Sequence, residues 1–209
     1  MSSLLRFLES GTAELARAFT KSADVQCLLA GACGADEYRR LLERLRRGFA
    51  VIELQAFADL PEPLHARLKT HRMTWRLRHD IGILGGTTPL PARAEDLENA
   101  GRFSTASAKL GAQFALALVL DSIAKGQQAL TACLGSALVS CLLFNGRRAP
   151  GEPQFGTVIR SVIENQAADI DWSEAMAAAR RTLRTLRHAL AEPPRTADRL
   201  FPQTGCDTL

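Results

Sequence analysis

The stretch Phe114–Leu130 reads FALALVLDSIAKGQQAL, and it decides the fold class. It begins with seven apolar residues, becomes polar from Asp121 to Gly126, and is apolar again at its end. The pattern predicts one long helix with a small, polar segment at its middle. A glycine inside a helix costs about 1 kcal/mol relative to alanine, so Gly126 needs a packing or functional reason. Either a flat or bulky ligand approaches the backbone there or another helix crosses tightly, and we favour the crossing.

Helical periodicity extends over the rest of the chain, and strand-like alternation is scarce. The expected helices span 3–8, a segment from Thr12 onward, Asp36–Glu53, His65–Gly82, Glu95–Leu110, Phe155–Asn165 and Ala175–Ala191. Ala129–Phe144 either continues the central helix or packs behind it, and an apolar turn over Val25–Ala30 ends at Gly31. Three segments rich in proline or glycine are expected to be breaks or loops: Leu60–Pro63, Thr87–Pro91 and Asn145–Pro153. The length of 209 residues fits one sizeable domain or two small ones. We expect one all-α, bundle-like domain over residues 1–192 and a loosely attached tail over 193–209.

The composition is that of a soluble globular protein, with 46% hydrophobic and 23% charged residues. The formal net charge is +4, and most basic residues are arginines scattered among acidic residues along the helices. No dense basic patch interleaved with aromatic residues is visible, so we do not expect a nucleic-acid partner. An arginine-lined mouth for an acidic small ligand fits the charge pattern equally well.

The cysteines and the N-terminal residues indicate a cytoplasmic protein. The five cysteines are odd in number and form no CxxC pair, which favours buried free thiols in a reducing compartment. Residues Met1–Leu8 lack the pattern of a signal peptide. No uninterrupted apolar run approaches the roughly 20 residues that cross a bilayer, so we expect no membrane association.

Four segments taken together resemble the heme oxygenase family. The first runs from Thr12–Ala16 through Leu28–Gly31 and Asp36–Leu42 to Glu53, and is similar to that family's Thr-x-x-Leu-His, Leu-Leu-x-Gly and Glu-Tyr-x-x-Leu-Leu motifs. The second, Trp75–Gly85, resembles its basic helix with an Asp-Leu-x-x-Leu-Gly ending. The third, Leu118–Gln127, resembles its glycine-rich distal helix, and Ala175–Ala191 resembles its closing alanine-rich helix. The resemblance covers roughly residues 11–191 in the family's order.

The resemblance implies a heme oxygenase-like helical bundle in which two helices enclose a heme. In that family a proximal histidine binds the iron, and the distal helix lets oxygen reach a meso carbon. The products are biliverdin, carbon monoxide and iron, and an electron donor protein supplies the electrons. The iron carries out the chemistry, whereas the protein supplies the axial ligand, the distal backbone and anchors for the propionates.

The sequence departs from the family's pattern at both faces of that pocket. Ala16 occupies the position of the proximal histidine, and a methyl group cannot coordinate iron. On the distal side Ser122 replaces the first glycine, Gly126 is retained, and Gln127 replaces the last glycine. Lys125 stands where an apolar residue is expected. Because both faces are altered together, we expect a changed function.

Other residues could take over part of the family's binding role. The histidines His65, His71, His79 and His188 and the thiols Cys27 and Cys33 are candidate iron ligands, although each has an ordinary structural explanation. Arg184 belongs to an arginine stripe on the last helix, which could anchor carboxylates or could be a solvated face. Glu53 and Asp80 fit structural ion pairs better than catalysis.

Two hypotheses follow. The first is a heme oxygenase whose iron ligand comes from elsewhere or from solvent, with Ala16, Ser122, Gly126 and Arg184 around the heme. The second is a non-catalytic helical module that holds heme, another tetrapyrrole or a flat acidic ligand. A different chemistry on the same fold, thiaminase-like or diiron, ranks last, since clustered glutamate and histidine ligands for a diiron centre are not found.

Overall fold

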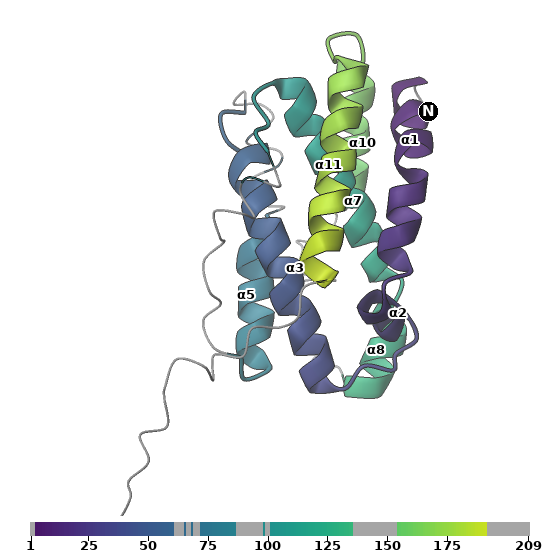
Figure 1. Ribbon diagram of the computed structural model, residues 1–209, viewed down its shortest axis with the longest axis vertical. Coiled ribbons are helices and arrows are strands. Elements are labelled where there is room, and N and C mark those ends of the chain that lie inside the picture. The colour runs from purple at the N-terminus through teal and green to yellow at the C-terminus, as the bar shows by residue number, and fades with distance from the viewer. Residues whose placement is uncertain are drawn as a thin grey trace, which may run out of the picture.

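The computed structural model describes residues 3–60, 65, 68, 72–86, 98, 101–135 and 154–191. The regular elements in these residues are all helices, which confirms the all-α class. They are α1 (Ser3–Thr20), α2 (Ala23–Leu29), α3 (Ala35–Ala56), α5 (Thr74–Ile83), α7 (Ala106–Ala124), α8 (Gln127–Leu134), α10 (Phe155–Gln166) and α11 (Trp172–Ala191). The long helices run roughly side by side along the long axis of the molecule, and α2 and α8 lie together at one end (Figure 1).

Helix α7 is the centre of the bundle. It packs most extensively against α11 and also contacts α10, α3, α1 and α2. Its residues are apolar on nearly every side, which is typical of a helix surrounded by other helices. It is also the one helix of the described residues that is long and apolar enough to cross a membrane, and 72% of the window tested is buried inside the protein. The expectation that no segment associates with a membrane stays a prediction.

The crossing of α7 and α11 depends on a glycine. A methyl group added at Gly111 would lie 2.7 Å from the carbonyl carbon of Ala175 on α11. Because real side-chain carbons do not approach so closely, only glycine allows the two backbones this separation. Apolar side chains from the surrounding helices fill the rest of the core, among them Tyr38, Phe49 and Phe114.

Several predicted boundaries are confirmed. Helix α3 begins after Gly34, whose backbone N–H donates to the Glu37 carboxylate at 2.9 Å, as the acidic first turn suggested. Gly31 ends the turn after α2 with a φ of +65°. Helices α10 and α11 cover the two segments expected after residue 154.

Three other boundaries were predicted wrongly. The break near Gly11 is absent, and Thr12 is not an N-cap, because α1 is continuous and the Thr12 hydroxyl donates to the Leu8 carbonyl at 2.6 Å. The expected helix over His65–Gly82 is interrupted at residues 72–73, and α5 begins only at Thr74. The expected helix over Glu95–Leu110 is interrupted over 101–105, and α7 begins at Ala106 after the Thr105 side chain accepts from Ala108 N.

The central stretch is two helices instead of one. Helix α7 ends at Ala124, a turn follows at Lys125 and Gly126, and α8 continues from Gln127. The expected continuation to Phe144 is confirmed as far as Leu134. The predictions for 61–64, Thr87–Pro91, Asn145–Pro153 and the tail over 193–209 lie outside the described residues, as do those for His71, Cys141 and Cys206.

Candidate functional site

The turn between α7 and α8 packs tightly against α2. A methyl group added at Gly126 would lie 2.9 Å from the Leu28 carbonyl oxygen and 3.1 Å from Leu29 Cα. The packing is reciprocal, because a methyl group at Gly31 would lie 2.6 Å from the Ala129 carbonyl oxygen on α8. The side of Gly126 that a ligand would need is therefore occupied by α2, which agrees with the tight helix crossing that we favoured.

The other polar residues of the α7 stretch also have structural partners. Ser122 donates its hydroxyl to the Leu118 carbonyl of the same helix at 2.8 Å. Arg160 Nη2 on α10 donates to the Asp121 carboxylate at 3.1 Å and brings α10 against α7. Gly156 lies beneath this contact, since a methyl group there would be 2.8 Å from Asp121 Oδ2.

The remaining predicted site residues are not gathered around one space. Ala16 on α1 is half-buried and packs against the hydrophobic core, whereas Arg184 on α11 is exposed. Neither residue, nor Ser122 or Gly126, lines the two cavities described below. That Ala16 and Gly126 face each other across one cleft stays a prediction, and these contacts do not support it.

The candidate replacement ligands do not form a metal centre among the residues that the structure describes. Groups of three or more histidine, cysteine, aspartate or glutamate side chains that could hold a metal do not occur there. His79 is exposed, and its Nδ1 lies 3.6 Å from the buried Asp80 carboxylate. Burial raises the pKa of Cys33 well above its usual range, helped by a hydrogen bond with the Cys27 thiol, so Cys33 is held as the neutral thiol. This agrees with the expectation that burial keeps such a thiol protonated.

Glu53 has a structural role at the start of α5. Its buried carboxylate accepts from Met73 N, from Thr74 N at 3.1 Å and from the Thr74 hydroxyl at 2.6 Å. It therefore satisfies backbone donors at the N-terminus of that helix. Burial raises the pKa of Glu53, although these hydrogen bonds and the nearby Arg72 act in the opposite direction.

One cavity lies on the outer side of the α7–α8 turn. Its volume is about 620 Å³. It is lined by Ala124, Lys125, Gln127, Gln128, Thr131 and Ala132. The Thr131 hydroxyl is engaged with the Gln127 carbonyl at 2.8 Å, so the exposed Lys125 and the amides of Gln127 and Gln128 are the groups that could receive a ligand. The residues that line this cavity lie within the stretch Phe114–Leu130 or directly after it.

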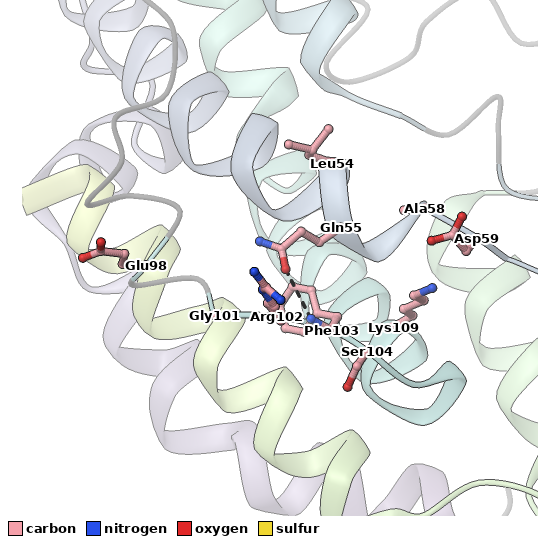
Figure 2. A pocket seen from close by; sticks show the side chains of 10 residues that line it. All are labelled: Leu54, Gln55, Ala58, Asp59, Glu98, Gly101, Arg102, Phe103, Ser104 and Lys109. Carbon is pink, nitrogen blue, oxygen red and sulfur yellow. Dashed lines mark hydrogen bonds between the residues drawn. The ribbon is translucent and has the colours of Figure 1, made fainter.

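A second cavity, of about 660 Å³, lies at the other end of α7, where the C-terminal end of α3 approaches it. Figure 2 shows the ten side chains that line it: Leu54, Gln55, Ala58, Asp59, Glu98, Gly101, Arg102, Phe103, Ser104 and Lys109. Both volumes are within the range of about 300–1,000 Å³ that is usual for small-molecule sites. No metal ligand set is present in either lining.

Lys109 is the residue of this second cavity that sequence reasoning missed. Only 7% of its surface is exposed, yet its ammonium group makes no hydrogen bond or ion pair with the described residues. The signal was a lysine inside an otherwise apolar and small-residue helix, between Ala108 and Leu110. It was overlooked because the expected helix began at Glu95, which made Lys109 one charge on a polar segment instead of part of the core.

No family model, curated protein or solved structure gives a significant match to this chain.

Proposed function

We propose that the protein is a non-oxidising binding module that holds a tetrapyrrole or another flat acidic molecule. The cavity at the α7–α8 turn supports this proposal most directly, because it lies in the stretch that resembles the distal helix and presents Lys125 beside two amide side chains. A cation flanked by amides suits the carboxylate of an acidic ligand. The apolar surfaces of Ala124 and Ala132 are available to a flat ring system.

The residues present do not fit the heme site of the family that the sequence resembles. Ala16 offers no donor atom to iron, and Gly126 is covered by Leu28 and Leu29 instead of facing a ring. The proposed ligand is therefore held by its acidic groups and by apolar contact with Ala124 and Ala132, without a bond from α1 to a metal.

Titration with hemin and with biliverdin tests the proposal. Binding is expected to sharpen and shift the absorption band of either pigment, and hemin that is then reduced under oxygen should not give biliverdin absorption. Lys125→Ala should weaken biliverdin binding about two- to fivefold, as the loss of one exposed ion pair predicts. The matched variant Lys21→Ala removes an exposed lysine outside the cavity lining and should leave binding unchanged. Pigment spectra that the protein does not alter would end the proposal.

A second candidate is oxidative opening of heme with an iron ligand supplied by solvent or by another residue. It needs a heme position that does not use the backbone of Gly126, because Leu28 and Leu29 cover that residue. In the same hemin experiment, conversion of the heme band to biliverdin absorption after addition of reductant and oxygen would support this candidate. The electron donor would be a separate protein.

The placement of Ala16 has a test of its own. If α1 borders a heme site at this residue, Ala16→His should give the spectrum of a five-coordinate, histidine-bound heme. Ala18→His is the matched control, since successive helical positions two apart point to nearly opposite sides of α1. Equal spectra for the two variants would contradict the alignment of Ala16 with the proximal histidine.

A further inference from the structure

The cavity between α3 and α7 is lined by Lys109, whose ammonium has no hydrogen bond or ion pair among the described residues. An ammonium without an anionic partner inside a protein either keeps its hydrogen bonds to water or exchanges that water for a ligand. Lys109 is more than nine-tenths buried and forms no ion pair with Asp59 or Glu98, although both belong to the same lining. Its Nζ atom is not sealed inside the bundle, unlike Gln113 Oε1, which is buried without a hydrogen-bond partner. The ammonium is therefore available to an anion that enters the cavity.

A second hydrogen-bond donor faces the same space. Gln55 Oε1 accepts from the backbone N–H of Phe103 at 3.2 Å, and this contact fixes which end of the amide is oxygen. Gln55 Nε2 has no hydrogen-bond acceptor among the described residues, so its two protons are free for a ligand. Figure 2 shows Gln55 and Lys109 on either side of the Phe103 ring, with Lys109 extending from α7 toward Ala58 and Asp59.

The lining also limits the charge of the ligand. Phe103 is buried and, with Leu54 and Ala58, provides apolar surface for a hydrocarbon body. Asp59, Glu98 and Arg102 are exposed residues of the lining, and the two carboxylates outnumber the guanidinium, so once Lys109 is paired the remaining groups repel additional negative charge on a ligand. A ligand with one anionic group fits these features better than a dianion or a phosphate.

From this arrangement we propose that the cavity is a binding site for a small monocarboxylate with an apolar, ring-sized body. The carboxylate pairs with Lys109 Nζ, and the body lies against Phe103 and Ala58. Gln55 Nε2 donates to an uncharged acceptor at the ligand's other end, a group that the phenylacetate probe lacks, so this probe tests the Lys109 contact alone. This site is independent of the α7–α8 cavity, because the two linings share no residue.

Phenylacetate is a suitable probe, with phenylacetamide as its uncharged analogue and 1,4-phenylenediacetate as the dianion. Binding to the full chain is measured by ligand-observed NMR and by isothermal titration. Phenylacetate should bind, and both analogues should bind about tenfold more weakly or not at all. Lys109→Met, which keeps the length of the side chain, should weaken phenylacetate binding by about 10- to 100-fold because it removes a charged hydrogen bond. Lys21→Met, at an exposed lysine outside both cavity linings, should bind phenylacetate like the wild type.

The unfolding midpoint separates this role from a structural one. Because the Lys109 ammonium has no partner among the described residues, Lys109→Met should unfold at the same temperature as the wild type or at a higher one. If Lys109 serves binding, its replacement leaves the unfolding temperature unchanged or raises it. If Lys109 were structural, its replacement would lower the unfolding temperature. Unchanged phenylacetate affinity in Lys109→Met, or no binding to the wild type at millimolar phenylacetate, would overturn the proposal.

A measurement on unmutated Lys109 covers the case in which the variant does not fold. The chain has four lysines, so ¹³Cε-labelled lysine gives four signals, and Lys21→Arg, Lys69→Arg and Lys125→Arg assign three of them. The fourth signal belongs to Lys109 and should be the one that moves as phenylacetate is added. A shift confined to the other three lysines, or no shift, would equally overturn the proposal.

Discussion

The two ends of α7 differ in how tightly the protein packs around them. Gly126 follows the C-terminal end of α7 and has no side chain, and the backbone of α2 lies where a side chain would be. At the N-terminal end of α7 Lys109 brings a long charged side chain into the bundle, and a cavity of about 660 Å³ lies beside it. A glycine in a helix therefore indicates that another group lies close to it but not which group, whereas a buried lysine with no partner among the described residues indicates a ligand more directly.

The largest expected effect concerns the helix crossing between these two ends. Gly111→Ala places a methyl group 2.7 Å from the Ala175 carbonyl carbon, so it should lower the free energy of unfolding by about 3 kcal/mol. Urea denaturation measures this loss. The control Gly82→Ala, where no atom lies within 4 Å of the added methyl group, should instead raise stability by about 0.5 kcal/mol. Equal stabilities for the two variants would contradict the close approach of α7 and α11.

Gly126→Ala tests the packed end of the comparison. The added methyl group meets the Leu28 backbone at 2.9 Å, so a loss of about 2 kcal/mol in unfolding free energy is expected. Lys125→Ala, at the exposed neighbouring position, should change stability by less than about 0.5 kcal/mol. If Gly126→Ala proves neutral, the space beside Gly126 is open and the ligand explanation of this glycine regains support.

The helices and the unusual glycine could be predicted from the sequence. The contacts between helices that are distant in the chain could not. Helical periodicity located α3, α10 and α11, and the cost of a helical glycine drew attention to Gly126. Periodicity does not specify what lies across from a residue, however, because that depends on contacts between segments such as α2 and α8 that are distant in the chain. The break before Thr74 was missed for the same reason, since the cap of α5 comes from Glu53 on another helix.

Glu53 gives a smaller effect that depends on pH. Burial raises its pKa above the ordinary value of 4.5, so the folded state holds this proton more tightly than the unfolded state does. The resulting stabilisation is fully present below pH 4.5 and is lost as pH rises through the folded-state pKa. The unfolding free energy of the wild type minus that of Glu53→Gln should therefore fall between pH 4.5 and neutrality.

Chemical denaturation at a series of pH values measures this difference. Glu14→Gln, at an exposed position of α1, controls for the loss of one acidic group. A difference between wild type and Glu53→Gln that grows with pH would mean that the hydrogen bonds from Met73 and Thr74 outweigh burial.

Ser122 should give the smallest effect. Its hydroxyl bonds only to the Leu118 carbonyl of its own helix, so Ser122→Ala should alter the thermal midpoint by no more than the equivalent of about 0.5 kcal/mol. Ser122→Gly restores the glycine found in the family that the sequence resembles and should cost about 0.5 kcal/mol in helix propensity. Tighter hemin binding by Ser122→Gly than by Ser122→Ala would place a ligand near this turn of α7.

The enclosure of α7 by its neighbours also has a consequence for motion. Its backbone N–H groups between Ala112 and Leu116 sit under fully buried side chains and are covered by α1, α3, α10 and α11. Deuterium can reach these amides only when the whole bundle opens, so their exchange rates report the global equilibrium between folded and unfolded chains. Amides of the short peripheral helix α8 can exchange through local fraying. The difference between the exchange rates of the α7 amides and those of the α8 amides therefore reports the cooperativity of the fold without any substitution.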